Sequence, residues 1–75
     1  MKLPSREKIE ALKKKYPAGT TVELIAMDDV QAPPAGTRGE VWGVDDMGDV
    51  MVTWQNGSTL SLIPSVDPFR IVKTD

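Results

Sequence analysis

The stretch that decides the fold is Thr37–Gly57, which reads TRGEVWGVDDMGDVMVTWQNG. Near its end Val50, Val52 and Trp54 occupy every second position. This period of two predicts a β-strand with one buried face. Asn56-Gly57 follows at once and indicates a type I′ hairpin turn, because both residue types tolerate positive φ. The stretch therefore predicts a β-hairpin whose returning strand fills the core.

The outgoing strand of the same hairpin, GEVWGV, interrupts its alternation once. Val41 and Val44 are three residues apart, so they share a face only if an extra residue is inserted between them. Gly43 is a natural position for a β-bulge that returns Val44 to the inner face. Trp42 is out of phase with both valines and is expected to face outward. Trp54 is expected in the core, where its indole N–H needs a partner.

Other parts of the chain carry further strand signals. Residues 20–26 (TTVELIA), 58–63 (STLSLI) and 69–73 (FRIVK) each predict a short strand. Residues 64–68 begin and end with proline, so they cannot continue a strand and predict one 3₁₀ turn before the last strand. Five short strands with tight turns favour a mainly β fold, a five-stranded SH3-like barrel over residues 20–73.

The N-terminal part predicts one α-helix over residues 5–16. Ser5 is a good N-cap, because its hydroxyl can accept a hydrogen bond from the first turn. Ile9, Leu12 and Tyr16 form one narrow apolar stripe. A helix this short is marginal alone in water, so we expect the stripe to dock on the β body.

Length and composition limit what the chain can be. Its 75 residues make a single small domain, residues 1–75. Cysteine and histidine are both absent, which removes thiol chemistry, the usual zinc ligands and the usual general base. DDMGD has neither the spacing nor the distant Glu of a calcium loop. We therefore expect no enzyme activity, no metal and no cofactor.

The sequence also bears on localisation. No apolar run approaches the roughly 20 residues that a transmembrane helix needs, and the N-terminus does not resemble a signal peptide. We expect a cytoplasmic protein without membrane contact.

Charge is divided unevenly along the chain. Residues 1–15 carry six cations and two anions, a net charge of +4, whereas residues 16–75 carry three cations and nine anions, a net of −6. A basic segment on an acidic body is one interpretation, and a solvated helix face is the other. The acidic body disfavours a nucleic-acid platform, because phosphates are repelled by it.

Acidic residues cluster in two expected loops, with one tryptophan nearby. The candidate binding residues are Trp42, Asp45, Asp46, Asp49, Asp28 and Asp29. In an SH3-like barrel the two loops flank the same face, so we expect the five carboxylates to converge there. Carboxylates suit the arginine fork, and an exposed tryptophan offers a stacking surface. Turn formation alone also favours Asp at such positions, so both interpretations stay open.

Two functions follow as hypotheses. The first is a non-enzymatic protein-interaction module whose acidic face binds a basic protein or peptide, with the chain a monomer or weak dimer. The alternative is a nucleic-acid-associated accessory protein that contacts phosphates through Lys8 and residues 13–15 of the basic helix.

Several motifs resemble a known family. YPAGT, MDDVQAPPAGT, GVDDMGDV, W-x-NG and LIPSVD are similar to the family named domain of unknown function 4314, and the resemblance runs from Pro4 to Val72. Gln55 and Trp42 depart from the residues usual in that family. The resemblance implies a small SH3-like barrel and a bacterial, phage or mobile-element setting. It implies no catalytic or binding residues.

Overall fold

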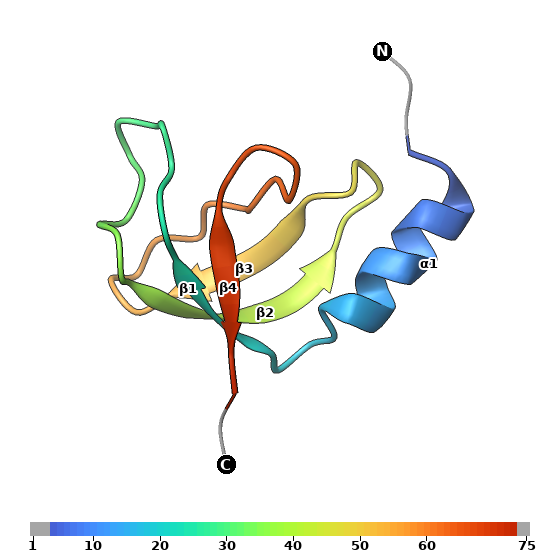
Figure 1. Cartoon of the computed structure of the whole chain (residues 1–75), viewed down its shortest axis with the longest axis horizontal. Helices are drawn as coiled ribbons and strands as arrows, with labels where there is room; N and C mark the ends of the chain where they lie inside the picture. The colour runs from blue at the N-terminus through green and yellow to red at the C-terminus, as the bar shows by residue number, and fades with distance from the viewer. Residues whose placement is uncertain (1–3, 74–75) are drawn as a thin grey trace.

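Within the described part of the chain, four strands form one open antiparallel sheet, and a single helix packs at one end of it (Figure 1). The computed structural model describes residues 4–73. The elements are α1 (Arg6–Lys15), β1 (Thr21–Leu24), β2 (Arg38–Val44), β3 (Val50–Trp54) and β4 (Phe69–Val72). The strands lie in the order β3-β2-β1-β4. The expected mainly β structure with one N-terminal helix is thus confirmed.

The bulge in β2 is present, and its extra residue is Trp42. Val41 pairs with Val52, and the next pair joins Gly43 to Met51, so the register shifts across Trp42. Because one residue is inserted, the valines on both sides of the bulge face the core and Trp42 is left 58% exposed. The expected outward orientation of Trp42 is confirmed.

Both hairpin turns have the same form, and it is not type I′. Gly57 donates its N–H to the carbonyl of Trp54 at 2.9 Å and has a φ of 89°, while no non-glycine residue among 4–73 has a positive φ. Asn56 therefore occupies an ordinary turn position, and Gly57 alone is left-handed. The same pattern recurs where Gly48 donates to Asp45 at 3.0 Å. This is the three-residue hairpin loop, a turn followed by a left-handed glycine.

The strand expected over residues 58–63 is reduced to one isolated bridge, in which Leu62 and Val50 exchange both backbone hydrogen bonds at 2.8 Å. Regular pairing stops at Leu60, which lies two residues closer than Leu62 to the loop at residues 55–57. Its carbonyl accepts the indole Nε1–H of Trp54 at 2.8 Å, and its N–H is given to the Ser58 hydroxyl at 3.3 Å. These bonds use the groups that a continuous ladder needs, so the described residues contain four strands and not five.

The turn before β4 is held by a buried carboxylate. Val66 N–H donates to the Ile63 carbonyl at 2.9 Å, the i to i+3 bond expected of a 3₁₀-like turn. Asp67 is only 8% exposed, and its carboxylate accepts the Ile63 N–H at 3.0 Å. The turn thereby delivers the chain to the start of β4.

Helix α1 begins and docks as its sequence indicates. The Ser5 hydroxyl accepts the Lys8 N–H at 3.2 Å, and Tyr16 caps the other end. Ile9 and Tyr16 are buried and Leu12 packs against the core from a half-buried position. No helix among the described residues has the length and apolar character needed to cross a membrane.

The core lies between the inner face of the sheet, α1 and the segment that follows β3. Its buried side chains are Ile9, Tyr16, Val22, Leu24, Val41, Val44, Val50, Val52, Trp54 and Leu62. Trp54 is the largest of the fully buried side chains, and it pairs with Gly39, where β2 and β3 approach each other closely.

Gly39 permits that close approach. A Cβ at Gly39 would lie 2.5 Å from Val52 Cγ1 and 2.9 Å from the Thr53 carbonyl oxygen, contacts that cannot be relieved without moving the backbone. We predict that Gly39→Ala lowers the free energy of unfolding by about 1–3 kcal/mol. Chemical denaturation followed by tryptophan fluorescence measures the change.

Gly43→Ala on the same strand is the matched control. Its Cβ would meet only the terminal Cε of Met51, the flexible end of a half-buried side chain. We expect a change of about 0.5 kcal/mol or less. Equal losses in the two variants would contradict the role given to Gly39.

Candidate binding surface

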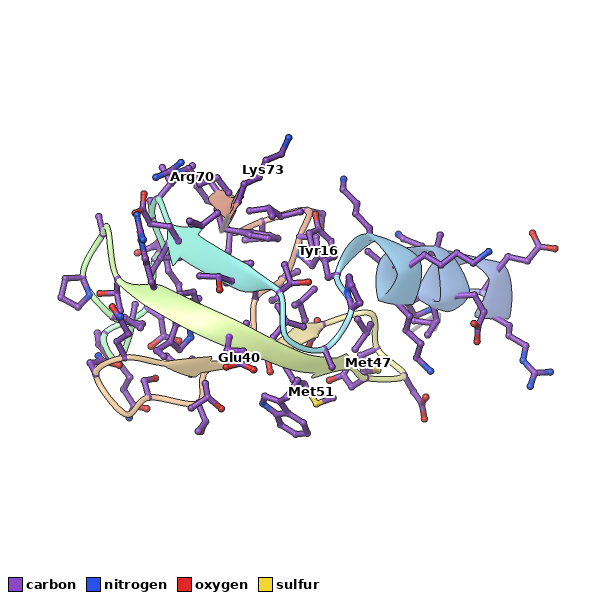
Figure 2. The ribbon with its side chains drawn as sticks, turned by 90° about the horizontal axis from the view of Figure 1, so that it is seen from below. Tyr16, Glu40, Met47, Met51, Arg70 and Lys73 are labelled. Atoms are coloured by element: carbon purple, nitrogen blue, oxygen red, sulfur yellow. The ribbon has the colours of Figure 1, made fainter. Side chains whose placement is uncertain are left out.

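The outward side chains of the β2–β3 hairpin form three rows across the two strands. The rows are Arg38 beside Gln55, Glu40 beside Thr53, and, at the bulge, Trp42 with Met51, which pairs with the adjacent Gly43. Figure 2 shows Glu40 and Met51 on the same side of the hairpin. We call these six residues the outer hairpin face. Arg38 and Gln55 form its polar end, Trp42 and Met51 form its apolar end, and Glu40 with Thr53 lies between the two ends.

The apolar end is set by the bulge. Trp42 is more than half exposed, and the Met51 side chain lies against Gly43, with its Cε 2.9 Å from where a Cβ would be. Glu40 precedes Trp42 by two positions on the same face, so the two side chains start about 7 Å apart. An aromatic ring, a thioether and a carboxylate are thus neighbours on an exposed surface.

The polar end contains a shallow hollow of about 440 Å³. Its lining residues are Thr21, Arg38, Gly39, Glu40, Thr53, Trp54 and Gln55. Hydroxyl, amide, guanidinium and carboxylate groups surround it, which gives both donors and acceptors of hydrogen bonds. The hollow and the Trp42 row are adjacent along β2, so one extended segment can contact both.

An ion-pair row fixes Arg38 at the edge of this hollow. Glu23 of β1 accepts Nε–H of Arg70 at 2.8 Å and Nε–H of Arg38 at 3.3 Å, from the strands on its two sides. The hydrogen bond from Arg70, and then that from Arg38, lowers the pKa of Glu23. The stabilisation is present above the ordinary pKa of a glutamate and is lost as pH falls through the lowered pKa.

Asp45 supports its own turn. Its Oδ1 accepts the N–H of Met47 at 3.0 Å and the N–H of Asp49 at 2.9 Å. Two backbone bonds on one carboxylate are the usual reason for Asp at such a position. The hydrogen bonds give Asp45 a structural role in its turn, and its part in partner binding stays a prediction.

Asp46 lies on the side of the turn that faces α1. It lines a hollow of about 390 Å³ together with Arg6, Glu10 and Lys13 of the helix. The helix, with both cations and an anion, therefore lies beside this carboxylate.

Asp49 is half-buried in a narrow cleft of about 130 Å³ between α1, the turn and residues 63–65, where Lys8 is also part of the lining. Burial raises the pKa of Asp49, and the charges of Asp45 and then Asp67 raise it further. Asp49 thus lies at the contact between helix and sheet.

Asp28 and Asp29 do not join the other acids. They lie in the loop of residues 25–37, which leads into β2 at Arg38, whereas Asp45 follows the opposite end of that strand (Figure 1). The expected convergence of five carboxylates is therefore wrong. β2 is continuous across its bulge and holds the two loops a strand length apart. Asp29 also caps its own turn, accepting the Gln31 N–H at 2.8 Å.

Some residues of the outer hairpin face were not singled out from the sequence. Glu40 lies two positions before Trp42 on the same strand, whereas Met51 is brought to the bulge only through the pairing of β2 with β3. The alternation of Met51 and Thr53 with the core valines was the signal that could have found them. Among residues 4–73, no group of three or more carboxylates is arranged to hold a metal ion.

The fold and this surface define a class, a small mainly β domain with one docked helix and an exposed aromatic on the outside of its sheet. A family model described as Domain of unknown function (DUF4314) matches residues 5–72, so the chain belongs to that family. Comparisons with curated proteins and with solved structures found no match.

The raised pKa of Asp49 gives a pH-dependent prediction. A raised pKa means that the folded protein binds the proton more tightly, so stability falls as pH rises through that pKa. Asp49→Asn mimics the protonated form at every pH. We expect it to raise the free energy of unfolding at pH 7, by less than about 1 kcal/mol because the group is only half-buried.

The gain should vanish below about pH 3, where Asp is protonated in folded and unfolded chains alike. Thermal unfolding at several pH values measures it. Asp46→Asn, which removes the same charge from the exposed neighbouring position, serves as the control and should change stability little. A gain for Asp49→Asn that is the same at every pH would contradict the explanation.

Proposed function

We propose that the chain is a non-enzymatic protein-interaction module that binds a basic protein or peptide through the outer hairpin face. The observation that carries the proposal is the position of Trp42, 58% exposed on a bulge that holds it out of the core. If Trp42 were buried, its side chain would stabilise the small core. On the outer hairpin face it leaves a large apolar surface in contact with water, which is unfavourable. Tryptophan is enriched among residues that dominate binding energy.

Charge favours a basic partner. Glu40 flanks Trp42 on the same face, and Asp45 and Asp46 follow at the end of β2. A cationic side chain over the indole can make a cation–π contact while it meets the nearby carboxylate. Asp28 and Asp29, at the other end of β2, take no part in this surface. The sequence contains no histidine or cysteine for catalysis, which supports a binding role.

We also propose that the domain is an SH3-like barrel. The spatial order β4-β1-β2-β3 continues with residues 58–62 beside β3, through the bridge of Leu62 to Val50. A short turn then leads into the last strand, which pairs with the first. This is the strand order expected of such a barrel, with the fourth strand shortened. A cytoplasmic, bacterial or phage setting accords with the family resemblance.

A nucleic-acid role for α1 is the second candidate. The helix docks through Ile9 and Leu12, while residues 13–15, all lysines, stay exposed. A role of this kind requires binding to DNA or RNA that weakens steeply as salt rises. Undetectable binding of the whole chain to duplex and single strands at low salt would exclude it.

Retention of a partner on the immobilised protein tests the main proposal. We expect wild-type protein to retain a basic partner from bacterial lysate, and Trp42→Ala and Glu40→Lys to lose it, because they remove the stacking surface and reverse the adjacent charge. Val30→Ala is the matched control, since Val30 is a fully exposed apolar residue in the loop of residues 25–37.

Thermal unfolding separates lost binding from lost folding. Trp42→Ala should change the free energy of unfolding by about 0.5 kcal/mol or less, as expected for an exposed side chain. Equal retention by wild type, Trp42→Ala and Glu40→Lys would exclude this face as the binding surface.

A further inference from the structure

The outer edge of β4 is open to solvent. β4 is the last strand of the sheet, and among the described residues no strand lies beyond it. Its four residues are all at least partly exposed, in contrast to the buried alternate positions of β1, β2 and β3. An open strand edge presents backbone donors and acceptors to another chain.

The pattern of hydrogen bonds shows which backbone groups face this edge. Leu24 donates to Thr37 and accepts from Gly36, both on the β2 side, whereas the next residue, Ile25, donates to Pro68 at 2.9 Å on the β4 side. Bonding direction alternates along antiparallel strands. Positions 68, 70 and 72 therefore bond toward β1, and Phe69 and Ile71 direct their N–H and C=O groups outward.

Charges on the outer side of the sheet alternate toward the same edge. Arg38, Glu23 and Arg70 are cross-strand neighbours on β2, β1 and β4, giving the order positive, negative, positive. Arg70 bonds Glu23 through Nε and leaves 55% of its side chain exposed. Lys73 follows β4, and Figure 2 shows Arg70 and Lys73 at the β4 side of the molecule, with the Lys73 side chain extending away from it. The next strand position in this row therefore suits a carboxylate.

The inner side of the edge is apolar and incompletely covered. Ile71 pairs with Val22, which is fully buried, yet Ile71 itself is 41% exposed. Phe69 packs its ring against Tyr16, with 5.3 Å between the ring centroids, and is half-buried. An apolar side chain from one further strand would cover Ile71 and extend the same layer.

We propose that the open edge of β4 accepts an extended acidic segment of a partner protein as an added strand. The backbone groups of Phe69 and Ile71 supply the ladder, Ile71 contacts an apolar side chain of the segment, and Arg70 with Lys73 binds its carboxylates. Strand addition of this kind derives affinity from the main chain and specificity from alternate side chains.

The same cations disfavour a second copy of this chain as the occupant. Two β4 edges placed side by side would bring two Arg70 and two Lys73 side chains into one small area. Charged residues on a short edge strand are a common protection against self-association. An acidic segment meets the edge without this repulsion. The β4 edge is separate from the outer hairpin face, so either proposal can fail alone.

The test uses the whole chain and a synthetic peptide in which valine alternates with glutamate. We expect the peptide to slow hydrogen exchange at the Phe69 and Ile71 amides and to shift their NMR signals. Arg70→Gln should weaken binding roughly two- to fivefold, the range for one cross-strand charge pair. A peptide with lysine in place of glutamate should not bind.

Ile71→Pro removes one outward N–H without removing a bond to β1, because proline is tolerated where an edge strand faces solvent. We expect it to abolish peptide binding while the β1–β4 cross-strand NMR contacts remain. If that variant does not fold, Arg70→Gln and the lysine peptide still decide the matter.

Three results would overturn the proposal. One is equal binding of the glutamate and lysine peptides, and another is slow exchange of the Phe69 and Ile71 amides in the free monomer. The third is a concentration-dependent dimer in sedimentation that buries β4, which would make a second copy the occupant. Trp42→Ala should bind the peptide as wild type does, which keeps this test independent of the outer hairpin face.

Discussion

The one-residue bulge in β2 is the constraint on which the rest of the structure depends. A strand of period two cannot place Val41 and Val44 on one face, and the core needs both. Because Trp42 is inserted between them, Val41 and Val44 can both pair with β3 and both face the core. The same insertion places the indole on the outer side, next to Met51. Core packing and the exposed aromatic are thus two results of one change of register.

Trp54 organises the opposite side of the hairpin. Its ring fills the core, and its indole N–H must find an acceptor there. It finds the Leu60 carbonyl, which a regular fourth strand would have used for its ladder. The segment after β3 is therefore an irregular strand with one regular bridge at Leu62. The indole hydrogen bond thus lies beside the point where regular pairing stops, and it satisfies a donor that would otherwise be unpaired in the core.

The acidic residues show how much charge the fold itself uses. Asp45 and Asp29 cap turns, Asp67 holds the turn before β4, and Asp49 is half-buried against α1. Few of the carboxylates therefore remain for a partner, and the body is less uniformly acidic in space than in sequence. The three cations of residues 16–75 are Arg38, Arg70 and Lys73, and they lie on the outer side of the sheet or at β4. The lysines of α1 lie on the other side of the acidic turn of residues 45–49. Two surfaces of different character result, an aromatic one with carboxylates and an edge with cations.

The sequence by itself determined the helix and its Ser5 cap, the positions of the four strands, the outward Trp42 and the buried Trp54. These features depend on the periodicity of neighbouring residues and on local turn chemistry, which a short stretch of chain carries within itself. Tertiary structure alone decided the form of the Gln55–Gly57 loop, the loss of the strand at Leu60, the separation of Asp28 and Asp29 from Asp45, and the ion-pair row that ends at the β4 edge. The last two depend on which groups meet across strands distant in sequence, and charges at such distances leave no local pattern. The first two involve residues close in sequence, but they depend on the backbone conformation of the loop and on the acceptor that the Trp54 indole finds, which periodicity does not show.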